Sequence, residues 1–159
     1  MKKLIRGLTK YICHVDSPGH FKPKFVMLVG APGSGKTTYA ENLFGYARIG
    51  VDNCHSKSEL KRRAFGLAGK ISRVVMDGTF RFKNERQFYL TMAKNEGYET
   101  KIIYFDVPYK VCLERLMNRA HHPTLDNSDE KKVKQALGDF FKRFEEIEDG
   151  EADEIKIIK

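Results

Sequence analysis

The sequence predicts an α/β fold in which a parallel sheet is covered by helices on both faces, as a three-layer sandwich. Short apolar runs alternate with longer helical stretches along most of the chain, and this alternation is typical of parallel strands joined by helical crossovers. The 159 residues are close to the commonest length of a single domain, and 41% of them are hydrophobic. One buried core is therefore expected.

The expected elements follow one another in a regular order. The five strands are the short apolar runs at residues 25–29, 47–51, 73–76, 101–105 and 154–158. The five helices lie between them, at residues 36–44, 57–68, 84–95, 109–119 and 129–146. Ser56 and Glu59 form a capping box at the start of the second helix, and Gly97 follows the third helix where a C-terminal glycine is favoured.

The first 24 residues do not fit the alternation. They contain six basic residues, one acidic residue and the turn-rich segment Ser17-Pro18-Gly19-His20. We interpret residues 1–24 as a basic N-terminal arm and residues 25–159 as the folded domain. No apolar run approaches the roughly 20 residues that a membrane helix needs, and no signal sequence is evident. We therefore expect a cytoplasmic protein that does not enter membranes.

Charge is distributed unevenly along the chain. The formal net charge is +8, and seven acidic residues fall between positions 145 and 154. Residues 1–144 therefore carry 27 basic and 14 acidic side chains, a balance of +13, which attracts polyanions. Nucleic acid is one candidate partner. Binding of small phosphorylated substrates would explain the same charge, so composition does not distinguish a nucleic-acid partner from a small phosphorylated one.

One motif points to a specific chemistry. The segment Gly30-Ala31-Pro32-Gly33-Ser34-Gly35-Lys36-Thr37 matches the pattern G-x-x-x-x-G-K-[ST] and directly follows the first expected strand. The glycines allow backbone N–H groups to converge on phosphate oxygens at the start of a helix. Lys36 is then expected to reach the outer phosphates, Thr37 to ligate Mg²⁺ and Thr38 to donate a further hydrogen bond. The motif predicts a site for ATP or a close relative with Mg²⁺.

This motif is the first of several landmarks through which the chain resembles the kinase domain of phage-type polynucleotide 5′-kinases, small P-loop kinases of the adenylate-kinase-like group. Asp52 follows the second strand, and His55 stands three residues later, where that family carries Arg. Asp77 ends the third strand. Arg115 and Arg119 follow Pro108 at the spacing of the family's paired arginines. The resemblance extends over about residues 25–119.

The resemblance implies a strand order of 2-3-1-4-5, consistent with right-handed crossovers, and an ATP-dependent transfer of the γ-phosphate to a 5′-hydroxyl. Asp52 would be the base that accepts the hydroxyl proton, although it could instead cap the next helix. Asp77 would lie on the metal side or anchor the substrate, or cap its strand end. Arg115 and Arg119 would lie over the nucleotide, Arg119 as a catalytic group, unless they form only a solvated basic face.

His55 departs from the family pattern and leaves the acceptor open. Histidine cannot offer the permanent bidentate fork of an arginine. A compensating arginine, Arg81 or Arg86, would keep a polynucleotide acceptor. A small-molecule hydroxyl, on a nucleoside, nucleotide or sugar, is the alternative. A third hypothesis is a nucleotide-driven switch module that transfers no phosphate.

Overall fold

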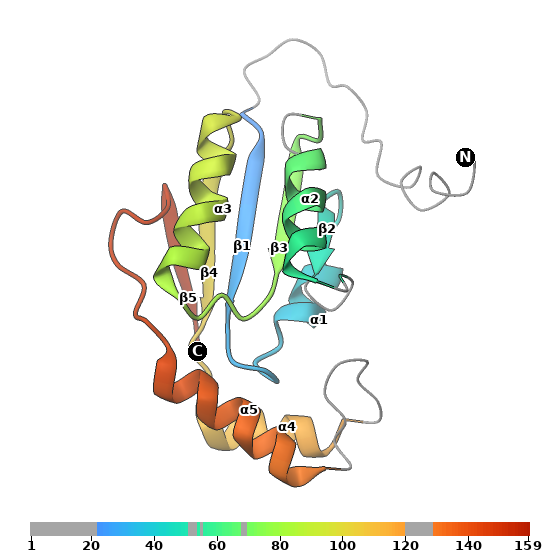
Figure 1. The fold of residues 1–159 in the computed structure, drawn as a ribbon, viewed down its shortest axis with the longest axis vertical. Coiled ribbons are helices and arrows are strands. Elements are labelled where there is room, and N and C mark those ends of the chain that lie inside the picture. Colours follow the sequence, from blue (N-terminus) through green and yellow to red (C-terminus); the bar gives the residue numbers. More distant parts are fainter. Residues whose placement is uncertain (1–21, 51–53, 55, 68–69, 120–128) are drawn as a thin grey trace, which may run out of the picture.

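The computed structural model describes residues 22–50, 54, 56–67, 70–119 and 129–159. Its centre is a five-stranded sheet in the order β2-β3-β1-β4-β5, and every neighbouring pair is parallel (Figure 1). The strands are β1 Lys24–Gly30, β2 Ala47–Gly50, β3 Arg73–Asp77, β4 Glu99–Phe105 and β5 Glu154–Ile158. The predicted α/β fold and strand order are confirmed.

Helices cover both faces of this sheet. They are α1 Lys36–Glu41, α2 Lys57–Leu67, α3 Lys83–Asn95, α4 Tyr109–Met117 and α5 Glu130–Arg143. Helices α2 and α3 pack on one face, whereas α1, α4 and α5 contribute to the core on the other. In Figure 1, α4 and α5 lie toward the carboxyl ends of the strands.

The core is divided in two by the sheet because successive strand residues point to opposite faces. In β1, Met27 and Val29 pack with α2 and α3, whereas Val26 and Leu28 pack with the other three helices. All four side chains are at most 4% exposed. A strand buried on both sides reads as a continuous apolar run, which is why β1 is recognisable from its sequence.

Local signals set several helix ends where the sequence predicts them. The Ser56 hydroxyl accepts a hydrogen bond from the Glu59 amide at 3.1 Å, and Gly97 has a left-handed φ of +80°. Helix α5 ends earlier than expected because Phe144 is extended, with φ −66° and ψ 123°. Its ring stacks on Tyr104 and Phe140, at centroid distances of 5.0 and 5.1 Å. Tertiary packing therefore ends this helix.

Parallel strands bring their carboxyl ends to one edge of the sheet, and this edge carries the predicted functional residues. Gly30 ends β1, and Asp77 ends the adjacent strand β3. Gly50, the last residue of β2, is in register with Asp77. Among the described residues, no helix is long and apolar enough to cross a membrane.

Candidate phosphate-binding site

The loop between β1 and α1 depends on glycine at two positions. Gly35 has φ +98° and immediately precedes α1, a conformation that residues with a Cβ rarely adopt. Gly33 has φ +78°, and a Cβ there would lie 2.7 Å from the Cys112 carbonyl and 2.8 Å from Leu116 Cγ. Helix α4 therefore packs directly against the loop, and only glycine leaves room for that contact.

The Lys36 ammonium lies inside the loop. Nζ donates hydrogen bonds to the Ala31 carbonyl at 2.7 Å and to Ser34 Oγ at 3.3 Å, and the residue is 7% exposed. These bonds hold the cation beside the loop's backbone N–H groups. A positive charge in this position is suited to binding phosphate oxygens.

Thr37 and Asp77, the two residues predicted to bind Mg²⁺, are in contact. The Thr37 hydroxyl donates to Asp77 Oδ2 at 2.9 Å, and Asp77 is 4% exposed. Arg48 donates to the same oxygen from Nε at 3.1 Å and from Nη2 at 2.6 Å. Three donors converge on one carboxylate oxygen, so Asp77 is fixed beside the start of α1.

Sequence reasoning missed Arg48. The signal was a charged residue inside a short strand whose other three residues are buried. Arg48 is in register with Val75, two residues before Asp77, so both side chains lie on the same sheet face. The contact between Arg48 and Asp77 follows from the alignment of β2 with β3, which depends on the fold and which no local motif contains.

Helix α4 brings one of the two predicted lid arginines to the loop. Arg115 Nη1 approaches the Ser34 carbonyl at 3.5 Å. Arg119 follows the end of α4, and its amide donates to the Leu116 carbonyl. Cys112 belongs to the same helix; burial raises the pKa of its thiol, and the nearby positive charges of Lys36 and Arg115 partly oppose the rise. The roles of both arginines toward a nucleotide stay predictions.

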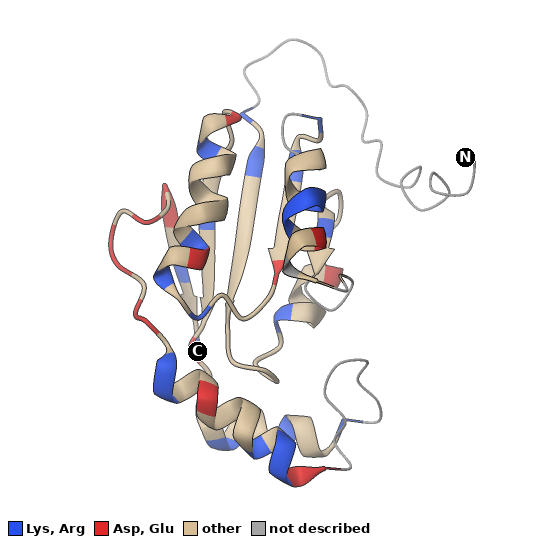
Figure 2. Cartoon of the chain, viewed as in Figure 1, with Lys and Arg blue, Asp and Glu red and all other residues tan. Residues whose placement is uncertain are grey.

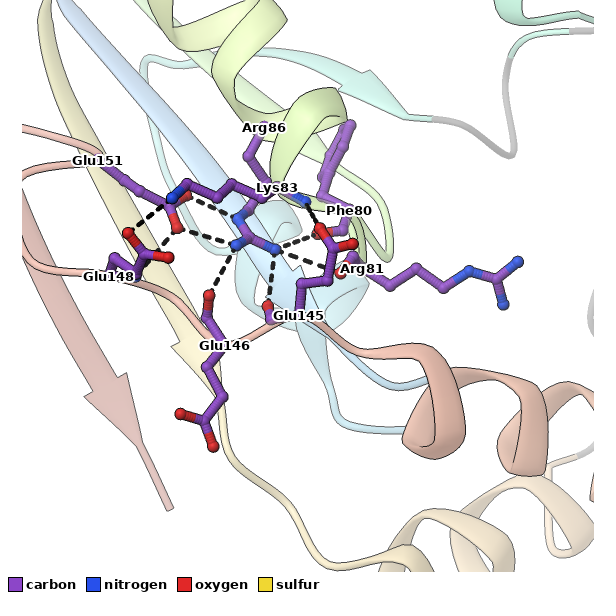
Figure 3. Close-up of polar contacts among 8 residues, drawn as sticks. All are labelled: Phe80, Arg81, Lys83, Arg86, Glu145, Glu146, Glu148 and Glu151. Atoms are coloured by element: carbon purple, nitrogen blue, oxygen red, sulfur yellow. Dashed lines mark hydrogen bonds and ion pairs between the residues drawn. The ribbon is translucent and has the colours of Figure 1, made fainter.

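Arg86 is not a surface group that could contact an acceptor, and the structure corrects this interpretation. Its side chain is fully buried, and its guanidinium makes a bidentate ion pair with Glu151 at 2.8 and 2.9 Å. The remaining N–H groups donate to backbone carbonyls, as Figure 3 shows. These carbonyls belong to Phe80, Arg81, Glu145 and Glu146.

The buried Arg86 therefore joins the segment after β3 to the segment after α5. Three further bonds join the same segments: the Glu145 amide donates to the Arg81 carbonyl at 2.9 Å, the Lys83 amide donates to Glu145 Oε2 at 2.5 Å, and the Lys83 ammonium pairs with Glu148 at 2.6 Å. Arg81 differs from Arg86. Its side chain extends away from this cluster in Figure 3, with the guanidinium 4.8 Å from the Phe82 ring centroid, so Arg81 remains the candidate acceptor contact.

Asp52 and His55 lie outside the described residues, and their predicted roles stay predictions. The flanking elements fix their place in the topology. Both lie in the connection from Gly50, beside Asp77 in the sheet, to Lys57 at the start of α2. No group of three or more His, Cys, Asp or Glu that could hold a metal occurs among the residues the structure describes.

Comparison with known proteins agrees with this geometry. Residues 25–147 match a family described as an AAA domain. The chain belongs to this AAA-domain family. The match begins with β1 and ends after α5, so the loop, Asp77, Arg115 and Arg119 all lie inside the AAA domain.

Two curated relatives of this AAA domain are named bifunctional polynucleotide phosphatase/kinases. The protein of Acanthamoeba polyphaga mimivirus is 28% identical over 109 residues, which are 64% of this chain and 25% of the relative. The protein of Schizosaccharomyces pombe (strain 972 / ATCC 24843) is 34% identical over 84 residues, 48% of this chain and 21% of the relative. The chain thus spans about a quarter or less of the length of these proteins.

Solved structures show the same fold in a differently named kinase. A sugar kinase from Janibacter sp. HTCC2649 matches with a TM-score of 0.58 and 18% identity, covering 86% of this chain and 84% of that one. At this identity the likeness concerns the fold alone. The AAA domain described here is a P-loop kinase fold, and its architecture is compatible with more than one acceptor.

Proposed function

We propose that this protein is an ATP-dependent kinase that moves the γ-phosphate to the 5′-hydroxyl of a nucleic acid. The observation that carries the proposal is the buried Lys36 ammonium inside a loop flanked by the Thr37–Asp77 pair. A cation, a hydroxyl and a carboxylate at one sheet edge supply the parts that phosphoryl transfer from a nucleotide requires.

The proposed step is an in-line displacement. The acceptor oxygen forms a bond to the γ-phosphorus while the bond from that phosphorus to the bridging oxygen of ADP breaks. Asp52 accepts the hydroxyl proton, in keeping with the resemblance to polynucleotide kinases. Lys36 compensates the charge that develops on the phosphate oxygens, and Arg115 lies close enough to the loop to add a second cation.

The chain's residues fit a magnesium ion. Mg²⁺ prefers oxygen ligands and is usually held by one or two carboxylates, a loop hydroxyl, waters and substrate phosphates. Thr37 and Asp77 would hold it, directly or through water, since their oxygens are already 2.9 Å apart. The bound ion would neutralise phosphate charge. Arg48 would keep the Asp77 carboxylate oriented toward α1.

Nucleic acid is favoured as the acceptor for two reasons. The curated relatives with detectable sequence identity carry the word polynucleotide in their names, and the +13 balance of residues 1–144 suits a polyanion. The likeness to a sugar kinase does not distinguish acceptors, because it rests on the fold. A small-molecule kinase remains the second candidate, since His55 replaces the arginine that polynucleotide kinases carry.

A transfer assay with ATP labelled on the γ-phosphate tests the proposal. The acceptors are single-stranded DNA and RNA with 5′-hydroxyl ends, nucleosides and sugars. The matched control is the same oligonucleotide carrying a 5′-phosphate, which blocks the reacting oxygen without changing the strand. Label on the 5′-hydroxyl strand alone supports the proposal. Label on a nucleoside or sugar but on no strand overturns it in favour of the small-molecule kinase, and release of phosphate without an acceptor indicates the switch module.

A further inference from the structure

A hollow of about 440 Å³ lies between α2 and α3, on the sheet face opposite α4 and α5. Two of its walls are phenylalanine rings that the fold leaves open to solvent: Phe65 is 52% exposed and Phe88 is 38% exposed. The remaining lining combines amide and hydroxyl groups with one thioether and comprises Gln87, Thr91, Met92 and Asn95. Large exposed rings beside a hollow are a feature of binding surfaces.

The rings are held in a fixed arrangement. Phe65 and Phe88 meet edge to face, with centroids 5.9 Å apart and an interplanar angle of 78°, and Phe88 meets Tyr89 in the same way at 5.1 Å. The Lys61 ammonium lies 4.4 Å from the centroid of Phe88. The hollow therefore presents preorganised aromatic surface with a positive charge at its rim.

The charge around the hollow limits what could occupy it. Helix α2 carries the run Lys61-Arg62-Arg63, visible as basic positions in Figure 2. Arg63 is paired with Glu59 at 2.6 Å, whereas Lys61 and Arg62 are exposed. The N-terminal arm carries +5, which repels this rim, and the net charge of +8 on a second copy of the chain disfavours its approach at long range. A polyanion with flat apolar groups matches both the charge and the rings.

We propose that the hollow between α2 and α3 binds single-stranded nucleic acid, with an unpaired base stacked on Phe65 and in edge-to-face contact with Phe88, and with the adjoining phosphates paired with Lys61 and Arg62. Aromatic rings beside a basic strip are the usual means of binding single strands without sequence preference. Gln87, Thr91 and Asn95 supply donors and acceptors for base edges. This inference rests on the proposed function and extends it to the substrate's trailing nucleotides.

The position of the hollow sets which nucleotides it contacts. Helix α2 begins two residues after His55, near the predicted acceptor site, and Phe65 follows Lys57 by eight residues. Eight residues correspond to roughly two turns, or about 12 Å along the axis. The stacked base is therefore not the reacting nucleotide but one further along the strand, so the contribution of the hollow depends on acceptor length.

Direct binding of a fluorescent single-stranded oligothymidylate to the full chain tests the proposal without requiring catalysis. The variants are Phe65→Ala and Phe65→Ala with Phe88→Ala, and the matched control is Phe44→Ala, which removes a phenylalanine that is 87% exposed in the turn before β2. Loss of the base stack on Phe65 is expected to weaken binding about 5- to 150-fold, and loss of Phe88 as well should weaken it further. Phe65→Tyr keeps a ring and retains affinity, and Phe44→Ala binds as the wild type does.

Steady-state kinetics separate this inference from the proposed function. With a long 5′-hydroxyl strand, the phenylalanine variants raise KM and leave kcat unchanged, whereas with a single-nucleotide acceptor neither constant changes. If the wild type phosphorylates strands but the variants bind oligothymidylate as it does, the hollow is not the binding surface and the inference is overturned. If strands are never phosphorylated yet binding depends on Phe65, the proposed function fails and the inference stands.

The same variants also test whether a second copy of the chain or the N-terminal arm occupies the hollow. Variants that leave oligothymidylate affinity unchanged but alter self-association in sedimentation would place a second copy in the hollow. Variants that instead alter the protease sensitivity of residues 1–21 would place the arm there. Either result overturns the proposal. Thermal unfolding of each variant confirms that the exposed substitutions have not disrupted the fold.

Discussion

At the scale of single residues, two kinds of position make up the candidate site. Lys36 is held by the loop that contains it, through bonds to Ala31 and Ser34. Asp77 is held by residues distant in sequence, Thr37 and Arg48. The position of Lys36 depends on its own loop and that of Asp77 on the sheet, so substitutions at the two residues should affect the site independently.

We expect Lys36→Ala to lower phosphoryl transfer by at least about 10²-fold, in the range observed when one donor to a developing oxyanion is removed. ATP binding should also weaken, because the cation between loop and phosphates is lost. Transfer rate and ATP affinity are to be measured beside Lys22→Ala, which removes an exposed lysine before β1. Full transfer activity in Lys36→Ala would end the assignment of this loop as the phosphate site.

Asp52→Asn should separate a kinase from a protein that only binds nucleotide. The substitution keeps the side-chain shape and removes the proton acceptor, so ATP affinity is retained while the transfer rate falls about 10²- to 10⁴-fold. Asp106→Asn is the matched control, because Asp106 also follows a strand at this sheet edge and is exposed. A near-normal rate in Asp52→Asn would make Asp52 a helix cap. A collapse of ATP affinity would assign it to the metal side instead.

The sequence predicts the local part of the site and not the distant part. The loop from Gly30 to Thr37 is recognisable because its spacing alone specifies where backbone and lysine lie. Arg81 and Arg86 read alike in the sequence, as basic residues after a strand end, yet Arg86 is fully buried and Arg81 is not. Only the fold brings Glu151 to Arg86, so a local reading cannot tell a buried ion pair from a solvated charge.

At the scale of elements, the buried Arg86–Glu151 pair attaches the chain after α5 to the start of α3. Burial alone would raise the pKa of Glu151, but hydrogen bonds from Arg86 and from the Glu148 amide lower it below its ordinary value. A carboxyl with a lowered pKa stabilises the folded state above its unfolded pKa, near 4.5. That stabilisation is lost as pH falls through the folded value.

Arg86→Met should lower the free energy of unfolding by about 3–5 kcal/mol, because it leaves a buried carboxylate and several backbone carbonyls without their donor. The matched control is Lys83→Met on the same helix, which removes the exposed pair with Glu148 and should cost about 1 kcal/mol or less. Urea unfolding at neutral pH measures the free energy of unfolding of both variants.

Glu151→Gln tests the pH dependence of the same ion pair. The difference in the free energy of unfolding between this variant and the wild type should shrink below pH 4.5, and a constant difference would contradict the assignment.

The elements themselves are largely predictable, and the exceptions have tertiary causes. All five strands and five helices occur where the apolar pattern predicts them. Helix α1 is shorter than expected and ends at Glu41, whose C-cap Asn42 precedes the turn to Gly45 with φ +81°. Helix α5 ends at Arg143 because Phe144 turns to stack on Tyr104. The periodicity of apolar residues in the sequence does not predict helix ends that are set by such tertiary contacts.

At the scale of the whole molecule, acidic residues are concentrated near the C-terminus and basic residues predominate in the rest of the chain. The acidic run between 145 and 154 is largely used internally, since Glu145, Glu148, Glu151 and Asp153 all accept hydrogen bonds from the domain. Where an acid pairs with a basic side chain, as Glu151 does with Arg86, both charges are neutralised, so the long-range field follows the net charge of +8. A long-range attraction for polyanions follows.

Binding of single-stranded nucleic acid should weaken with salt, with a slope in log affinity against log salt of about −0.7 for each phosphate contacted. Lys61→Ala should make the slope shallower by about that amount, whereas Lys131→Ala, an exposed lysine on α5, should not. Titrations at several salt concentrations measure the slope. Affinity that is independent of salt, or no detectable binding at low salt, would favour a small-molecule acceptor.

Helix α4 packs against Gly33 through the Cys112 backbone, and the thiol of the same residue can report how often the packing around this helix opens. The Cys112 side chain is fully buried, and its sulfur contacts the Val107 carbonyl at 3.6 Å. Alkylating reagents can reach it only when the packing around α4 opens. In a protein whose other two cysteines, Cys13 and Cys54, are replaced by serine, the alkylation rate would count those openings. If ATP binds between the loop and Arg115, as proposed, it should slow that rate, so the alkylation rate with and without ATP would measure how far the nucleotide closes α4 on the loop.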